Sequence, residues 1–178
     1  MANLPVPIPA SESPGNFITA ALWNANVFNG LTFLLNPPMF FGYQTAGQSL
    51  TSGTGTAVTM DTETIDTYGG HSTVTNTSRY TAQVAGTYLV WGGTCVNGAT
   101  SQTYLAGYVC KNGVEQPGSR AMTPANSSHT YTVPVMPLPV VMAVNDYVEI
   151  FVQADGTSPT THGGATQTSS MSVVWIHA

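Results

Sequence analysis

The chain has 178 residues, enough for one domain with a buried core and a short appendage. Only 6% of the residues are charged, and the cations Arg79, Lys111 and Arg120 are outnumbered by eight acidic residues. With a net charge of -5, no basic patch can neutralise a run of phosphates, which excludes nucleic-acid binding and polybasic attachment to a membrane. No apolar run approaches the roughly 20 residues of a membrane span, so we expect no membrane insertion.

Residues 1–38 are predicted to form a leader that is distinct from the rest of the chain. An extended Pro-rich stretch comes first, without the cationic region and continuous apolar segment of a signal peptide, so we expect synthesis in a host cytoplasm. A helical pattern follows, with Thr19 as its N-cap and Asn36 before two prolines that end it. Apolar side chains at helical spacing predict one apolar face. This docking face consists of Trp23, Val27, Phe28, Leu31, Leu34 and Leu35.

A helix of about 16 residues is only marginally stable alone in water. We therefore expect its apolar face to pack on its own copies, on the body of the protein, or on a larger assembly. These alternatives correspond to trimerisation or docking onto a virion for residues 1–38.

Residues 39–178 are predicted to form an all-β domain without a further helix. Segments rich in Val, Tyr, Thr and Phe alternate with Gly, Asn, Ser and Thr loops, which is typical of a β-sandwich or jelly roll. The Asn112-Gly113 pair predicts a tight hairpin. The expected strands are residues 40–45, 57–61, 79–83, 87–97, 104–111, 119–122, 129–136, 147–154 and 170–177.

Several expected strands carry apolar side chains on both faces. Residues 87–97 have large apolar side chains on either side, and residues 173–176 form a continuous apolar run. An antiparallel strand with one face in water should alternate between apolar and polar side chains. Because these strands do not, we expect another subunit to cover their second face. The predicted subunit interface consists of Tyr88, Val90, Trp91, Tyr108, Val174 and Trp175.

A series of motifs follows one order along the β region. A turn at Gly69-Gly70 precedes Tyr80-Thr81-Ala82, and Ala85-Gly86 opens the long apolar strand. Later come Lys111-Asn112-Gly113, Asn145-Asp146-Tyr147-Val148 and a closing strand at 169–176. This order resembles the complement component 1q/tumour necrosis factor-like jelly-roll domain, although Asn145 and Val173 stand where glycine is usual and Met171 replaces an aromatic residue. The resemblance implies a jelly-roll β-sandwich that is nearly always a homotrimer, presents a surface and is rarely an enzyme.

The leader carries a second resemblance, through residues 17–25 and 33–38. These segments are similar to the leader of small minor tail or head-fibre proteins of tailed phages of actinobacteria. The similarity implies a virion protein, either a minor tail protein (an adhesin) or a capsid decoration (a head fibre), that serves host attachment or particle stability. Its implied partners are other virion proteins of the capsid or tail, bound through the N-terminal segment, and a host cell-surface glycan. The alternative is a stand-alone carbohydrate-binding module.

No enzyme and no cofactor are predicted, because the residues that carry chemistry are scattered. His71, His129, His162 and His177 form no metal motif, and no Gly-x-Ser-x-Gly elbow is present. The acidic cluster Asp61, Glu63 and Asp66 could hold Ca²⁺ but lacks the EF-hand spacing. Cys95 and Cys110 are expected to be buried thiols. Tyr68, Tyr104 and Tyr131 could stack on sugars, but core or interface positions are favoured.

Overall fold

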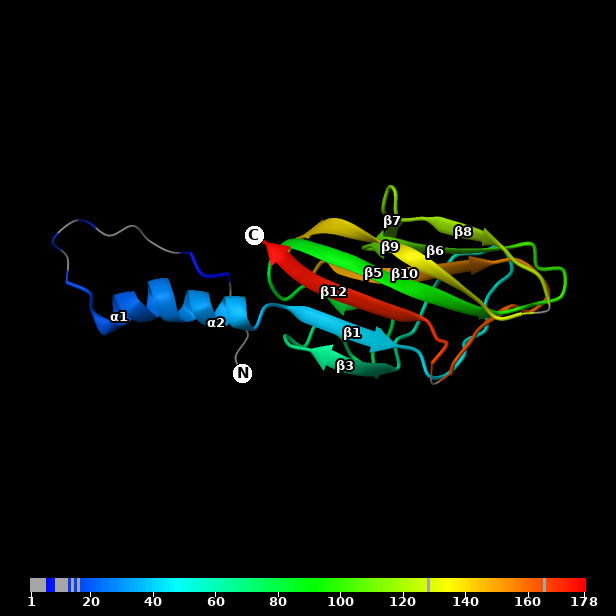
Figure 1. Ribbon diagram of the computed structural model, residues 1–178, viewed down its shortest axis with the longest axis horizontal. Coiled ribbons are helices and arrows are strands. Elements are labelled where there is room, and N and C mark those ends of the chain that lie inside the picture. Colours follow the sequence, from blue (N-terminus) through cyan, green and yellow to red (C-terminus); the bar gives the residue numbers. More distant parts are fainter. Residues whose placement is uncertain (1–5, 9–12, 14, 16, 128, 165) are drawn as a thin grey trace.

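The computed structural model describes residues 6–8, 13, 15, 17–127, 129–164 and 166–178. A helix projects from one end of a two-layered β-sandwich, and the C-terminus lies at that same end (Figure 1). Most of the expected Pro-rich stretch falls outside the described residues.

The helix covers residues 20–35, as the sequence predicts. It consists of α1 (Ala20–Trp23), a π-helical segment (Asn24–Phe28) and α2 (Asn29–Leu35). The Thr19 hydroxyl caps the first turn by accepting a hydrogen bond from the Leu22 amide at 3.2 Å. The helix ends before Pro37 and Pro38, because proline cannot donate the backbone hydrogen bond that would continue it. Both ends are therefore confirmed, while the π-helical segment was not predicted.

Within the described residues, twelve β-strands form two antiparallel sheets. Sheet A has the order β11-β5-β12-β1-β3, and β9 also pairs with β5. Its strands are β1 (Met39–Tyr43), β3 (Thr62–Asp66), β5 (Gly86–Asn97), β9 (Tyr131–Met142), β11 (Thr160–Thr161) and β12 (Ser170–His177). Sheet B has the order β2-β10-β6-β7, with β4 paired to β10 and β8 paired to β6. Its strands are β2 (Thr56–Ala57), β4 (Tyr80–Thr81), β6 (Tyr104–Lys111), β7 (Val114–Glu115), β8 (Ala121–Pro124) and β10 (Tyr147–Ala154).

The core lies between the two sheets and is built from alternate residues of their strands. In β10, the side chains of Val148, Ile150 and Val152 are fully buried. From sheet A, Tyr88 and Val90 meet them, and the Tyr88 hydroxyl donates a hydrogen bond to the Val84 carbonyl at 2.6 Å. The expected all-β sandwich is thus confirmed.

Two strands differ most from expectation. Of the expected strand 57–61 only Ala57 lies in a strand, β2, and β3 follows directly after the expected end. The other difference is the length of β9. This strand continues to Met142, six residues beyond the expected end at residue 136, although it contains Pro134, Pro137 and Pro139. Prolines are tolerated because β9 pairs with a neighbour, β5, along one side only, so the missing amides break no second ladder. This extension carries the β5–β9 ladder to Gly86, the first residue of β5.

Candidate self-association surface

The face of sheet A that points away from the core is predominantly apolar. The strand register aligns Phe41, Ser172 and Trp91 in one row across β1, β12 and β5. The next row contains Met39, Val174 and Leu89, and Pro139 of β9 lies opposite Leu89. We call this surface the outer face of sheet A. It consists of Met39, Phe41, Tyr43, Leu89, Trp91, Pro134, Met136, Pro139, Val141, Ser172, Val174 and Ile176.

Charge is distributed unequally between the two sheets. The strands β1, β5, β9 and β12, described in full, contain no Asp, Glu, Lys or Arg. All three cations of the chain form ion pairs with residues of sheet B or its loops, and Lys111 also donates a hydrogen bond to the backbone carbonyl of Val141 in β9 at 2.8 Å. These pairs are Arg79–Glu149 at 3.3 Å, Lys111–Asp146 at 2.8 Å and Arg120–Glu115 at 2.6 Å. Only the β3 edge of sheet A carries acidic residues, Glu63 and Asp66.

This arrangement makes the outer face of sheet A suitable for burial against another chain. Several of its side chains are strongly exposed, including Met136 at 57% and Val141 at 71%. A contiguous apolar patch on a folded chain marks an interaction site. Burying it would remove no charge from water, so the desolvation penalty that limits most protein surfaces is small here.

Most of the residues predicted for the subunit interface fall into two groups, those on the outer face of sheet A and those buried inside the chain. Trp91 and Val174 lie on the outer face of sheet A and are partly exposed. Tyr88 and Val90, by contrast, are fully buried in the chain's own core and offer no surface to a second subunit. Their assignment is corrected for a physical reason: only one of the two apolar faces of β5 is outward, and the other packs on sheet B.

Tyr108 and Trp175 also have partners within the chain. Tyr108 lies on the outward side of sheet B, where its ring stacks on Phe151 at 5.6 Å and the Arg120 guanidinium covers it at 4.0 Å. It is 6% exposed, so the interface assignment does not hold for Tyr108. Trp175 lies at the end of β12 and contacts Phe33 of the helix edge-on at 4.8 Å.

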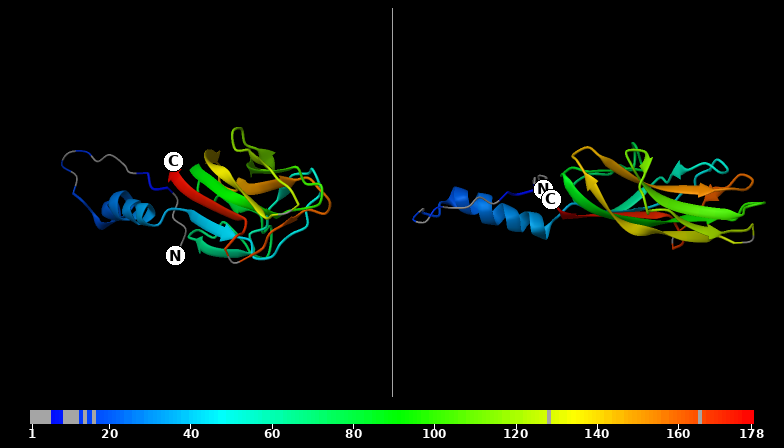
Figure 2. Two further views of the ribbon diagram at one scale, coloured as in Figure 1. Left: turned by 45° about the vertical axis from the view of Figure 1, so that its right-hand side comes forward. Right: turned by 90° about the horizontal axis from the view of Figure 1, so that it is seen from above.

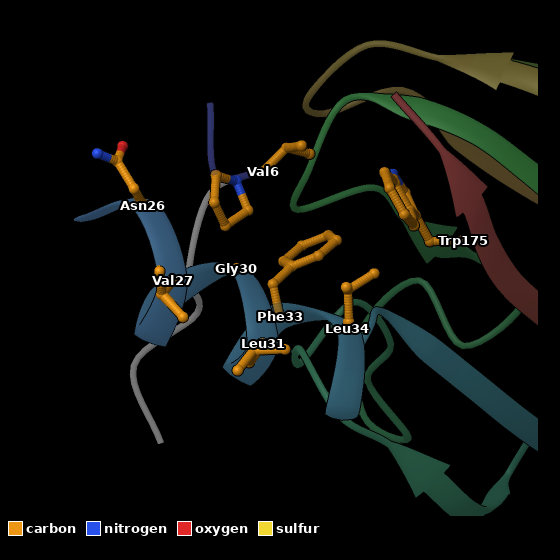
Figure 3. Close-up of a pocket in the computed structure, with 9 residues that line it drawn as sticks. Val6, Asn26, Val27, Gly30, Leu31, Phe33, Leu34 and Trp175 are labelled. Atoms are coloured by element: carbon orange, nitrogen blue, oxygen red, sulfur yellow. The ribbon is translucent and has the colours of Figure 1, made fainter. Parts of the chain in front are cut away.

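Phe33 is the buried residue that attaches the helix to the sandwich. Its side chain is 2% exposed and packs with Tyr68, Val84 and Trp175 at the open end of the two sheets. Figure 3 shows Phe33 pointing from the helix toward Val6 and Trp175. Sequence reasoning missed it, because Phe33 lies outside the stripe that defines the docking face.

The docking face itself remains largely uncovered. Its exposed members are Trp23 at 52%, Phe28 at 57%, Leu31 at 55%, Leu34 at 68% and Leu35 at 85%. Val27 is half-buried. An apolar cleft of about 340 Å³ lies beside this face, walled by Val27, Leu31, Leu34 and Trp175 among others (Figure 3).

The acidic residues considered for Ca²⁺ serve the loops instead. Asp61 accepts hydrogen bonds from the amides of Thr45 at 2.7 Å and Ala46 at 2.8 Å. Burial opposes its charge, but these hydrogen bonds outweigh that effect and lower the pKa of Asp61. Asp66 accepts from the Gly70 and His71 amides. Within the described residues, no three His, Cys, Asp or Glu side chains are grouped to hold a metal ion.

The remaining candidates occupy structural positions. The His71 ring packs against Phe40 at 4.8 Å, its Nε2 lies 2.9 Å from the Met60 carbonyl oxygen, and burial lowers its pKa. Cys95 and Cys110 are free, buried thiols, as expected.

The tyrosines considered for sugar stacking are at least partly buried. Tyr68 is 4% exposed and its ring contacts Phe33, so it cannot stack on a sugar. Tyr104 and Tyr131 are half-buried at strand ends.

No protein-family model and no curated protein matches this chain. Among solved structures, the globular domain of zebrafish complement 1qA is similar, with 14% identity and a TM-score of 0.55 over 79% of this chain and 97% of that chain. A crystal structure of murine APRIL at pH 5.0 is similar with 11% identity and a TM-score of 0.54, over 77% of this chain and 98% of that chain. The fold is therefore the complement 1q/tumour necrosis factor-like jelly roll. In the described part of the chain, no helix has the length and apolar character needed to cross a membrane.

Proposed function

We propose that this chain is a non-enzymatic structural protein of a phage virion, a homotrimer that forms a surface-exposed appendage. The carrying observation is the uncharged outer face of sheet A, which β1, β5, β9 and β12 build without one charged side chain. Closed cyclic symmetry would bury this face in every subunit and leave the ion-paired sheet B in water. The sequence resemblance to complement 1q-like domains favours three copies over two.

The virion role rests on the resemblance of residues 17–38 to phage leaders. In this proposal residues 1–38 attach the protein to other virion proteins of the capsid or tail, and residues 39–178 form a head that faces outward. The exposed docking face supports the attachment, since an uncovered apolar helix face in a folded chain calls for a partner.

The attachment is tested with the double variant Trp23→Ala plus Leu31→Ala. Both side chains are more than half exposed, so the head should fold normally while the protein fails to enter phage particles. Normal incorporation of the double variant would refute attachment through the helix.

Gold-labelled antibodies on intact particles distinguish the two possible locations, because antibodies against a tail protein label the tail tip and antibodies against a capsid decoration label the head.

A stand-alone carbohydrate-binding module is the second candidate, and one feature favours it. Phe41 and Tyr43 border a cavity of about 300 Å³ together with the hydroxyl-bearing residues Thr166, Thr168 and Ser170. Aromatic rings beside hydroxyl groups suit a sugar ring. Such a module would bind a host cell-wall polysaccharide as a single chain. Retention on that polysaccharide by a variant that cannot self-associate would favour the module, and loss of retention would favour the assembled appendage.

A further inference from the structure

We propose that residues 20–35 of three copies associate as a parallel three-helix bundle that extends the head along its symmetry axis. The occupant of the exposed docking face is thus a second copy of this chain, and the assembled bundle, rather than a single helix, attaches the protein to other virion proteins. The inference rests on the proposed homotrimer and assigns a partner to a surface that the trimer of heads alone leaves uncovered.

The composition of the helix suits contact with identical neighbours. Residues 17–38 contain no Asp, Glu, Lys or Arg, so parallel copies would bring no like charges together. The exposed members of the docking face, from Trp23 at 52% to Leu35 at 85%, form a stripe along one side. Parallel helices that share an apolar stripe pack by inserting side chains of one into gaps of the next.

The direction of the helix would also allow the helices of three copies to lie parallel to one another. It continues beyond the end of the sandwich in line with β1 (Figure 1), and the view from above shows it level with β12 and β9 rather than with sheet B (Figure 2). Phe33 fixes this direction by its contacts with Tyr68 and Trp175. If three heads associate through the outer face of sheet A, their helices emerge side by side, and three-fold symmetry brings the same residue of each together.

The apolar surface is continuous from helix to head. The cleft of about 340 Å³ has walls from the docking face (Val27, Leu31 and Leu34) and from Trp175 of β12, and Val6 and Pro7 of the same chain also line it. A side chain from a neighbouring helix would fill it. Although one 16-residue helix is marginal in water, a trimer of heads holds the helices at an effective concentration of the order of millimolar. Weak contacts between the helices are then sufficient to hold the bundle together.

Disulfide trapping in the full chain tests the bundle, with Leu31→Cys as the probe. Ala25→Cys is the matched control, because Ala25 is exposed on the same helix and is not a member of the docking face. The native thiols are buried and do not compete. The mass of each reduced variant is measured by light scattering, and covalent products are then counted after mild oxidation.

The expected result is a trimeric mass for both variants, with covalent dimers formed rapidly by Leu31→Cys alone. Since two of three identical thiols can pair, these dimers should include at most about two-thirds of the chains. A trimeric mass without dimers from Leu31→Cys, or equal dimers from both variants, would overturn the bundle and leave the homotrimer intact. A monomeric mass for both variants would overturn the bundle together with the trimer on which it rests.

Discussion

The Cys110 side chain is 2% exposed on β6, across from Glu149 of β10 and Glu115 of β7. Burial, followed by the two nearby carboxylates, raises the pKa of its thiol to about 12. Burial also raises the pKa of Cys95. Both thiols therefore stay protonated at neutral pH and are poor nucleophiles, which fits a structural role for each.

The Cys110 thiol should make stability depend on alkaline pH. Because its pKa is about 12 in the folded chain and 9.0 ordinarily, the folded state holds the proton more tightly. The stabilisation is complete below pH 9 and is lost as pH rises toward 12, at up to about 1.4 kcal/mol per pH unit. Urea unfolding from pH 8 to 11 should thus show a shallower decline for Cys110→Ala than for the parent chain. Equal slopes would contradict this assignment.

At the same residue scale, sequence reasoning identified the right residue types but not always their side of the sheet. Trp91 and Val174 lie on an outward face, since alternation along β5 and β12 places them there, and their part in a subunit interface stays a prediction. Tyr88 and Val90 lie on the opposite side of β5, in the core. The sequence shows that both faces are apolar, but which one is covered by sheet B depends on pairing between distant segments.

Among the elements, strands bounded by clear turn residues were the most predictable. Residues 104–111, 147–154 and 170–177 form strands with the expected limits. The five-residue strand β3 was missed, and so were the two-residue strands β7 and β11, because a segment of two residues carries no periodic pattern. The helix limits were predicted from Thr19 and Asn36, whereas the role of Phe33 was not. Its burial depends on a tertiary contact with Trp175, which no helical spacing encodes.

The attachment of the helix should depend on Phe33. Phe33→Ala removes the centre of a small cluster that is separate from the main core, and we expect the free energy of unfolding to fall by about 3 kcal/mol. The Trp175 indole N–H, which donates to the Ala85 carbonyl at 3.2 Å, should change its nuclear magnetic resonance shift as the ring leaves. Phe17→Ala is the control, because Phe17 is 90% exposed and should change neither quantity. An unaltered Trp175 resonance in Phe33→Ala would show that the contact is not formed in solution.

The whole molecule has one charged side and one uncharged side, and this difference determines which side can serve as an interface. The ion pairs of Arg79, Lys111 and Arg120 keep sheet B polar, while the outer face of sheet A carries aromatic and aliphatic side chains. Composition alone predicted scarce charge but not its segregation, since that depends on which strands share a sheet. The segregation is what makes one face a candidate interface and the other a solvated surface.

A matched pair of methionines tests which face is buried in the assembly. Met136 on the outer face of sheet A is 57% exposed, and Met122 on β8 of sheet B is 60% exposed. Neither glutamate substitution should unfold the chain. Met136→Glu should dissociate the trimer because it places a charge in an apolar interface, whereas Met122→Glu should leave the mass unchanged. Dissociation by Met122→Glu alone would assign the interface to the other sheet.

Association as a trimer through an uncharged sheet face is what the proposed appendage requires of this chain. It is tested by the mass of the full chain in solution, measured by light scattering after gel filtration. A trimer has three times the chain mass of 18.6 kDa and should be stable on dilution. A well-folded species of 18.6 kDa would contradict it, and the proposed appendage and helical bundle would lose their basis.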